Sequence, residues 1–446
     1  EYWTVDLPQF KDPFGDPRVI PHAVVLANTG ERAADITVDT RGDVAVTTAA
    51  VTIPPGAVET IIFPRADVEN TSRSMRSFRI SASEPVVAYQ FNPLNNVGVA
   101  SNDASLLLPA SAIGREYYVM SWPSGIVTPF APTAQTGWFT VVATREGETR
   151  VTITFTSDVF DTAGTGLLST PADMRGIRRG ETRTFRMQQY EVLNFEAKSA
   201  FTSIGDLTGS HIEADRPIVV FGGHEEAVLG EGGVGPDGQQ ESACCADHLE
   251  EQLFPVETWG LRYLAVHSPP RGNEVDYWRV LAARDGTRIT TNPAIPDLDG
   301  RTLNAGQWVE ITTTQSFEIA GSQPIMVGQY LVSQQDQGIT RTTGDPSFIL
   351  AVPAEQFRTD YAILVPRSYD QDWITVIRPA GAQIRVDGAV MPDGDFRSFG
   401  SGLYEYAYRA MSPGPHLFDA PDGDAFGIVG FGYDGAVSYG YPGGLN

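Results

Sequence analysis

Residues 244–263 read Cys-Cys-Ala-Asp-His-Leu-Glu-Glu-Gln-Leu-Phe-Pro-Val-Glu-Thr-Trp-Gly-Leu-Arg-Tyr and hold both cysteines of the chain. This stretch follows a glycine-rich segment and separates two halves with similar sequence patterns. On either side of it, short alternating runs of Val, Ile, Thr, Tyr and Phe are interrupted by Gly, Pro, Asp and Asn, which is typical of strands and turns. Within it, residues 247–253 favour two turns of helix capped by Asp247. The sequence therefore predicts an all-β fold with one brief helix.

Four related segments of about 100 residues recur along the chain, which is the size of an immunoglobulin-type sandwich. Each begins with an apolar residue followed by proline: Leu7-Pro8, Leu108-Pro109, Phe254-Pro255 and Val352-Pro353. We expect the first strands of the units at residues 22–26, 117–121, 263–268 and 361–366. Each segment ends with a short stretch of residues followed by a final apolar run, and in the first three units that stretch contains proline. A proline at a strand's first residue costs the sheet no hydrogen bond.

We therefore predict four tandem β-sandwich (Ig-like) units, with boundaries at 1–102, 103–246, 247–343 and 344–446. The alternative is a closed propeller-like assembly in which each period supplies two blades. Residues 437–442 resemble the opening strand of a fifth unit that does not continue.

The charge of the chain limits its partners. It has 446 residues with 31 Lys and Arg against 55 Asp and Glu, a net charge of −24. Such a chain repels phosphate backbones, so we expect no nucleic-acid binding. The acidic turns at 297–299 and 393–395 could bind calcium, although neither matches a complete calcium-binding loop. No apolar run approaches the ~20 residues that cross a bilayer, so we expect no membrane span. The predominance of Arg over Lys suggests a GC-rich bacterial genome.

Cys244 and Cys245 are adjacent, and three states are open to them. They could form a vicinal disulfide, remain reduced, or bind a metal. In the metal alternative, His224, His248 and Asp247 lie near the cysteines in sequence, and two imidazoles with a carboxylate or a thiolate could hold zinc. The other interpretation is that both histidines donate or accept hydrogen bonds within a loop. We predict the disulfide and no resident metal.

No catalytic motif is recognisable. Gly400-Ser401-Gly402 lacks the nucleophile-elbow pattern, and no histidine lies in a zinc-protease motif. Glu251 and Gln252 could belong to a recognition patch or hold the fold together. Trp259 is expected to fill the joint between the second and third units, with Gly260 allowing close backbone approach.

One family shares this set of residues. Cys245, His248, Glu251, Gln252, Leu253, Pro255, Trp259, Gly260 and Tyr263 resemble the core signature of the IgGFc-binding domain family. The resemblance is strongest from residue 101 to 443. It implies a secreted or cell-surface module whose role is binding or adhesion. The pairing of the cysteines departs from the family pattern, because here they are neighbours.

Three functions follow from these observations. The first is a non-enzymatic extracellular or cell-surface module that recognises a protein or a glycan through loops on a rigid β scaffold. The second is a structural component of a bacterial surface fibre that associates with itself through its termini. The third is a metal-dependent hydrolase centred on His224 and His248, which is the least favoured.

Overall fold

The computed structural model describes residues 1–11, 16–41, 44, 50–96, 99, 101–125, 135–162, 169–234, 240–340 and 343–445. In these ranges the regular structure consists of β-strands and short 3-10 helices, without an α-helix. Within the same ranges, no helix has the length and apolar character needed to span a bilayer. The predicted all-β class is thereby confirmed.

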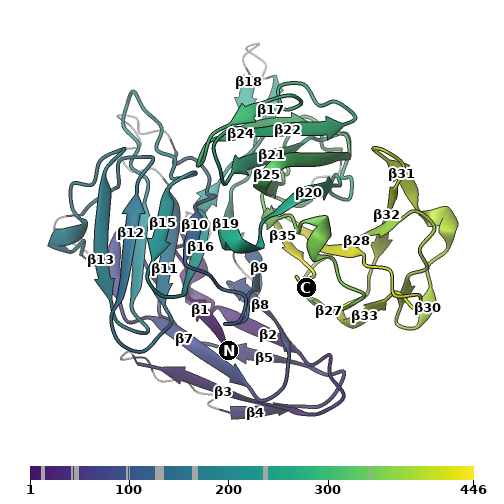
Figure 1. Ribbon diagram of the computed structural model, residues 1–446, viewed down its shortest axis with the longest axis horizontal. Helices are drawn as coiled ribbons and strands as arrows, with labels where there is room; N and C mark the ends of the chain where they lie inside the picture. The colour runs from purple at the N-terminus through teal and green to yellow at the C-terminus, as the bar shows by residue number, and fades with distance from the viewer. Residues whose placement is uncertain are drawn as a thin grey trace.

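The strands form four β-sandwiches, each with two antiparallel layers, which in the third unit are joined through one strand into a single seven-stranded sheet (Figure 1). When β6 (Ser72–Ser74) and β31 (Arg397–Phe399) are left out of the count, the first sheet of every sandwich has the same strand order: the unit's first, sixth, third and fourth strands. These sheets are β1-β7-β3-β4, β10-β15-β12-β13, β20-β25-β22-β23 and β27-β33-β29-β30. Their bounds are β1 Tyr2–Val5, β3 Ala34–Thr40, β4 Ala50–Ile53, β7 Ser77–Ala82, β10 Glu116–Tyr118, β12 Thr149–Thr154, β13 Thr182–Met187, β15 His211–Ala214, β20 Gly260–Ala265, β22 Thr287–Asn292, β23 Thr302–Leu303, β25 Phe317–Tyr330, β27 Asp360–Val365, β29 Arg385–Val386, β30 Ala389–Val390 and β33 Gly414–Asp419.

The second sheet also repeats, with the unit's last strand at one edge. These sheets contain β9-β8-β2-β5, β19-β16-β11-β14, β26-β25-β21-β24 and β35-β34-β28-β32. Their bounds are β2 Ala23–Ala27, β5 Val58–Ile62, β8 Val87–Asn92, β9 Asp103–Leu107, β11 Gly137–Ala143, β14 Val192–Glu196, β16 Ile218–Ala227, β19 Asp247–Gln252, β21 Asp276–Ala282, β24 Trp308–Thr313, β26 Phe348–Leu350, β28 Gln371–Pro379, β32 Tyr404–Ala410, β34 Gly427–Asp434 and β35 Val437–Pro442. In the third unit β25 serves both sheets, because its first half pairs with β20 and β22 and its second half with β21 and β26.

Smaller elements complete the sandwiches. β6 (Ser72–Ser74) extends the second sheet of the second unit, and β31 (Arg397–Phe399) extends that of the fourth. β17 (Glu231–Val234) and β18 (Gln240–Ser242) form a separate hairpin. The 3-10 helices are η1 Pro17–Val19, η2 Ala172–Met174, η3 Val256–Thr258, η4 Ala354–Gln356 and η5 Asp393–Asp395.

Burial differs between the two sheets of a sandwich, and the sequence explains why. Strands such as β3 and β12 alternate between buried and solvent-facing residues, as expected when one face of a sheet packs on the core. Strands such as β2, β11 and β19 are buried on both faces. Their second face contacts a neighbouring unit. For example, Tyr89 of the first unit donates a hydrogen bond to the Gly443 carbonyl of the fourth, at 2.9 Å.

A tyrosine at the start of each unit shows the fourfold repeat most directly. The hydroxyls of Tyr2, Tyr117, Tyr263 and Tyr361 donate to the carbonyls of Val86, Ile218, Ile325 and Phe426, which lie in the closing phrases of the four units. In the last three units the same hydroxyl accepts the backbone N–H of the residue three positions earlier. The predicted repeat of sandwich units is thus present, and the described residues form no propeller or barrel.

Three details of the predicted layout change. The first strand of the first unit is β1 rather than residues 22–26, which form β2 in the other sheet, so Leu7-Pro8 follows the opening strand instead of preceding it. β35 completes the fourth unit by pairing with β34, so residues 437–442 do not begin a fifth unit. The strands that follow residues 102, 246 and 343 each pair with the sheet of the preceding unit.

Consecutive units meet at a glycine. Gly260 lies against the linker into the fourth unit, where an added Cβ would lie 2.2 Å from Pro353 Cβ and 2.6 Å from a Glu355 carboxylate oxygen. Gly260→Ala is therefore expected to lower the free energy of unfolding by about 1–3 kcal/mol through overpacking. Chemical denaturation measures this change in the free energy of unfolding. Gly394→Ala is the control, because a Cβ there meets no atom within 4 Å and Gly394 has no positive φ. An equal effect of the two substitutions would refute the close contact.

Candidate functional site

The last strands of the four sandwiches meet in the middle of the molecule. β9 contacts β19 and β35, and β26 contacts the same two strands, so β9, β19, β26 and β35 close a ring; we call them the central strands. In Figure 1 the labels of β9, β19 and β35 lie between the surrounding sandwiches. Each central strand belongs to a different sandwich and pairs with another strand on one side only. The backbone groups on its other side therefore have no strand partner. Buried backbone N–H groups need acceptors, and here side chains supply them.

Asp103 of β9 is the principal acceptor. Its carboxylate accepts the backbone N–H groups of Phe348 at 3.1 Å, Glu250 at 3.1 Å and Gly440 at 3.4 Å, one from each of the other three central strands. It also accepts its neighbour's N–H and the Ser347 hydroxyl, the latter at 2.8 Å. One fully buried carboxylate therefore joins all four sandwiches.

The other acceptors come from β19. Asp247 accepts the N–H groups of Asn102 at 2.7 Å and Ser438 at 3.0 Å. Glu251 accepts the Leu350 N–H at 3.1 Å and the Ser105 hydroxyl at 3.0 Å. Gln252 accepts the Leu108 N–H at 2.9 Å through its side-chain oxygen.

The predicted helix over residues 247–253 is wrong, because residues 247–252 form β19. The strand pairs antiparallel with β16, with Phe221 opposite Gln252 and His224 opposite Leu249. The alternation was hidden because polar side chains occupy both faces, and all six residues are buried. Asp247 caps no helix; its carboxylate is used by backbone groups of neighbouring strands. Glu251 and Gln252 are at most 1% exposed, so they cannot form a recognition patch.

His248 and Glu250 form a buried pair, with Nε2 and Oε2 separated by 3.3 Å. Burial lowers the pKa of His248 to about 3 and raises the pKa of Glu250 well above its usual range. Both shifts favour the uncharged forms, so the two groups share a neutral hydrogen bond. Gln90 donates to both oxygens of Glu250, at 3.2 and 3.3 Å. The pair is sealed from solvent and therefore cannot act on a substrate.

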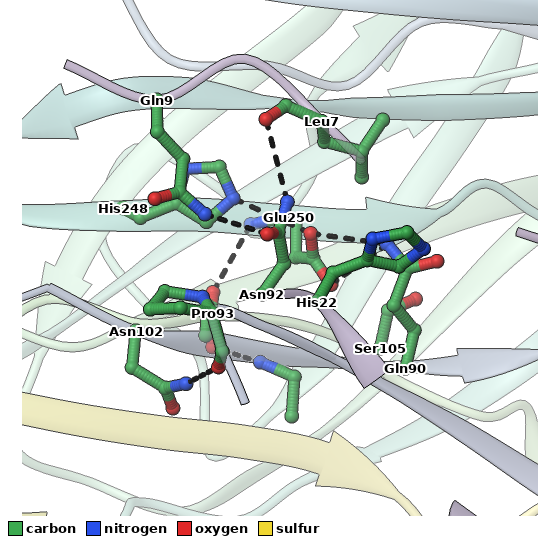
Figure 2. Close-up of polar contacts among 12 residues, drawn as sticks. Leu7, Gln9, His22, Gln90, Asn92, Pro93, Asn102, Ser105, His248 and Glu250 are labelled. Carbon is green, nitrogen blue, oxygen red and sulfur yellow. Dashed lines mark hydrogen bonds and ion pairs between the residues drawn. The ribbon is translucent and has the colours of Figure 1, made fainter. Parts of the chain in front are cut away.

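Figure 2 shows this pair within a wider polar layer between β19 and the first unit. Gln9 donates to the Asn92 side-chain oxygen at 2.6 Å, and Asn92 donates to the Leu7 carbonyl at 3.4 Å. Asn102 donates to the carbonyl of Pro93. The layer contains side-chain amides, the His248–Glu250 pair, the imidazole of His22, the hydroxyl of Ser105 and backbone groups.

The metal alternative finds no support in the described part of the chain. His224 is buried in β16, where its Nδ1 accepts the Glu226 N–H at 3.0 Å, and burial lowers its pKa to about 3. Asp247 is occupied by backbone donors. No group of three His, Cys, Asp or Glu side chains that could hold a metal ion occurs among the described residues. In the acidic turns, Asp299 accepts the Thr291 N–H and Asp393 accepts from Arg378, and calcium binding there stays a prediction.

The two cysteines form a vicinal disulfide immediately before β19. Both are partly exposed, unlike the strand that follows them. The Cys244 carbonyl accepts the Gln335 N–H at 2.6 Å, and the Cys245 N–H donates to Asp345 at 3.2 Å. Asp345 also accepts the Gln334 N–H at 3.1 Å, so this carboxyl ties the disulfide to the third unit.

Burial raises the pKa of Asp345 to about 7 from 3.8. Its contribution to stability is therefore complete below pH 3.8 and is lost as the pH rises through about 7, because the folded state holds a proton that the unfolded state releases. Asp345→Asn should flatten the pH dependence of the unfolding free energy across this interval. Denaturation at several pH values measures it, and an unchanged slope in the variant would contradict the assignment.

Trp259 is buried beside Tyr118 of the second unit, with ring centroids 5.9 Å apart, and its indole N–H donates to the Phe254 carbonyl at 2.9 Å. It lies at the joint between the second and third units.

Asp103 and Asp345 were not among the predicted site residues. A signal for Asp345 existed: it precedes Pro353 by eight residues, as Asp247 precedes Pro255. Asp103 has no such equivalent, because its role depends on the meeting of four sheets.

Comparison with known proteins agrees with the sequence resemblance. The family model described as IgGFc binding protein matches residues 103–432. The chain is 22% identical over 429 residues to the human protein named IgGFc-binding protein, covering 93% of this chain and 7% of that one. Two solved structures of anti-sigma factor domain-containing proteins align with this chain at 8% identity. The first alignment covers 46% of this chain and 85% of that protein; the second, with a protein from Clostridium clariflavum, covers 73% and 91%. Both have a TM-score of 0.13, which is too low to support an argument. Because the family model matches most of its length, the chain belongs to the IgGFc-binding protein family.

Proposed function

We propose that this chain is a non-enzymatic, extracellular protein-binding module. The observation that carries the proposal is the family match over residues 103–432. The human relative is named for binding the Fc part of immunoglobulin G. This chain corresponds to 7% of that protein, so the partner of this chain is proposed and not carried over from the relative.

The arrangement of the signature residues supports a binding role without chemistry. The side chains of Asp247, His248, Glu251 and Gln252 are buried between strands, where they fix the four sandwiches relative to one another. A rigid body of this kind lets loops on several units contact one partner together. Recognition is therefore assigned to surface loops and the signature to the scaffold.

The fibre alternative depended on an incomplete C-terminal unit that could accept a strand from another copy. β35 is already paired with β34 and buried, which leaves that strand unavailable for exchange. Self-association through other surfaces would be detected by light scattering in the experiment that follows.

The test uses the immobilised chain and purified secreted proteins in native and deglycosylated forms, with immunoglobulin G Fc as the first probe and Fab as its control. The proposal expects saturable binding to a protein that survives removal of its glycans. Binding that disappears with the glycans would overturn it. So would concentration-dependent oligomers in light scattering without binding to any protein of the panel. Binding to a protein other than Fc would support the proposed protein-binding module and exclude Fc as its ligand.

A further inference from the structure

A groove of about 720 Å³ lies between the second and third units, separate from the central strands. Its walls include Arg178, Arg179 and Lys198 from the second unit and Gln307 and Trp308 from the third. Pockets of roughly 300–1,000 Å³ suit small ligands. The groove is therefore large enough for one or two sugar rings.

The charge of this groove is opposite to that of the chain. Arg178 is paired with Asp158 at 3.0 Å, and the buried Arg279 is paired with Asp206 at 3.1 Å and with Glu310 at 2.8 Å. Arg179 and Lys198 have no salt bridge within the described ranges, so the four cations and three carboxylates at this joint leave a net charge of +1. In a chain of net charge −24 such a pair is unusual, and Lys198 is one of only two lysines. A net positive charge at a groove attracts an anion.

Trp308 provides a fixed aromatic wall. Its ring centroid lies 4.3 Å from the Arg279 guanidinium carbon, and that carbon also lies 4.4 Å from the ring centroid of Trp122. Arg279 is itself held by hydrogen bonds to the Ser121 carbonyl at 2.7 Å and to Glu310 at 2.8 Å. The indole of Trp308 is only partly buried, so it offers an apolar face whose orientation is set before any ligand arrives.

The groove also offers neutral polar groups. The exposed Gln307 side chain accepts the Asn304 N–H through its oxygen at 2.8 Å, and its amide nitrogen remains available to donate. Ser203 is exposed on the opposite wall. Cations, an aromatic face and neutral hydrogen-bonding groups thus surround a single space.

We propose that this groove binds an anionic saccharide, a sugar that carries a sulfate or a carboxylate. The anionic group pairs with Arg179 and Lys198, an apolar sugar face packs on Trp308, and hydroxyls bond to Gln307 and Ser203. This site goes beyond the proposed protein-binding function and does not depend on it.

The experiment is calorimetric titration of the whole chain with a sulfated disaccharide, 3′-sialyllactose and lactose. Both charged sugars, or one of them, should bind, and lactose should not; the difference between the charged sugars distinguishes sulfate from carboxylate. The double substitution Arg179→Gln with Lys198→Gln should weaken binding by at least about tenfold, since charge-assisted hydrogen bonds are lost. Lys11→Gln with Arg301→Gln removes the same charge at exposed positions elsewhere and should leave binding unchanged.

Four results would overturn the proposal: neither charged sugar binds; lactose binds as tightly; the groove variant binds as the parent chain does; or inorganic sulfate or an oligoglutamate peptide binds as tightly as the sugars. An unchanged melting temperature of the groove variant establishes that its loss of binding is not unfolding. Trp308→Phe supplies a second readout, with weaker sugar binding and unchanged affinity for inorganic sulfate.

Discussion

Replacing Asp103 with alanine is expected to lower the free energy of unfolding by at least about 3 kcal/mol, because it leaves several buried N–H groups without an acceptor. The carboxylate receives one N–H from each of β19, β26 and β35, and none of these groups can reach water. The loss should appear as a lower denaturation midpoint, in a single cooperative transition.

Two further variants provide the comparison for this result. Asp35→Ala removes an exposed carboxylate that accepts only the Thr52 hydroxyl among side chains and should change stability by no more than about 0.5 kcal/mol. Asp103→Asn keeps the shape but replaces one acceptor oxygen with a donor, so it should destabilise to an intermediate degree. Equal stability of Asp103→Ala and Asp35→Ala would show that the carboxylate does not join the units.

Replacing Arg279 with methionine is expected to cost about 3–5 kcal/mol, because removing one partner of a buried ion pair leaves the others uncompensated. Arg279 is 1% exposed; it reaches the second unit through Ser121, Thr208 and Asp206 and pairs within its own unit with Glu310. Its guanidinium also stacks between Trp122 and Trp308. Both the unfolding free energy and tryptophan fluorescence should report the loss.

The control for this prediction is an exposed arginine. Arg32 pairs with Glu84 at 2.7 Å with 78% of its side chain exposed, and such pairs contribute roughly 0–1 kcal/mol. Arg32→Met should therefore be nearly neutral. Arg279→Lys should be only partly tolerated, since an ammonium cannot stack flat between two indoles. Full stability of Arg279→Lys would mean that charge alone matters at this joint.

The sequence was most informative where one face of a strand meets water. Strands such as β12 alternate with a period of two, and tight turns rich in glycine separate them, so their existence and the fourfold repeat could be predicted. Trp259 and Gly260 were also assigned to a joint between units, where large and small residues pack together.

Prediction failed where the surroundings of a residue are set by other units. β19 carries polar side chains on both faces, so its pattern resembled a solvated helix, although the acceptors serve backbone groups of three other strands. The pairing of β35 with β34 and the placement of β1 depend on the sheets that receive them. The role of Asp103 could not be predicted for the same reason, because a single aspartate in a strand has no distinctive local pattern.

Hydrogen exchange followed by mass spectrometry tests most directly whether the four sandwiches are held by one buried ring of strands. We predict that the peptides containing residues 103–107, 247–252, 348–350 and 437–442 are the slowest to exchange and become labelled together, in one cooperative opening. This prediction would be contradicted if the 247–252 peptide exchanged rapidly while the other three remained protected, since the signature strand would then be a mobile surface segment rather than part of the scaffold.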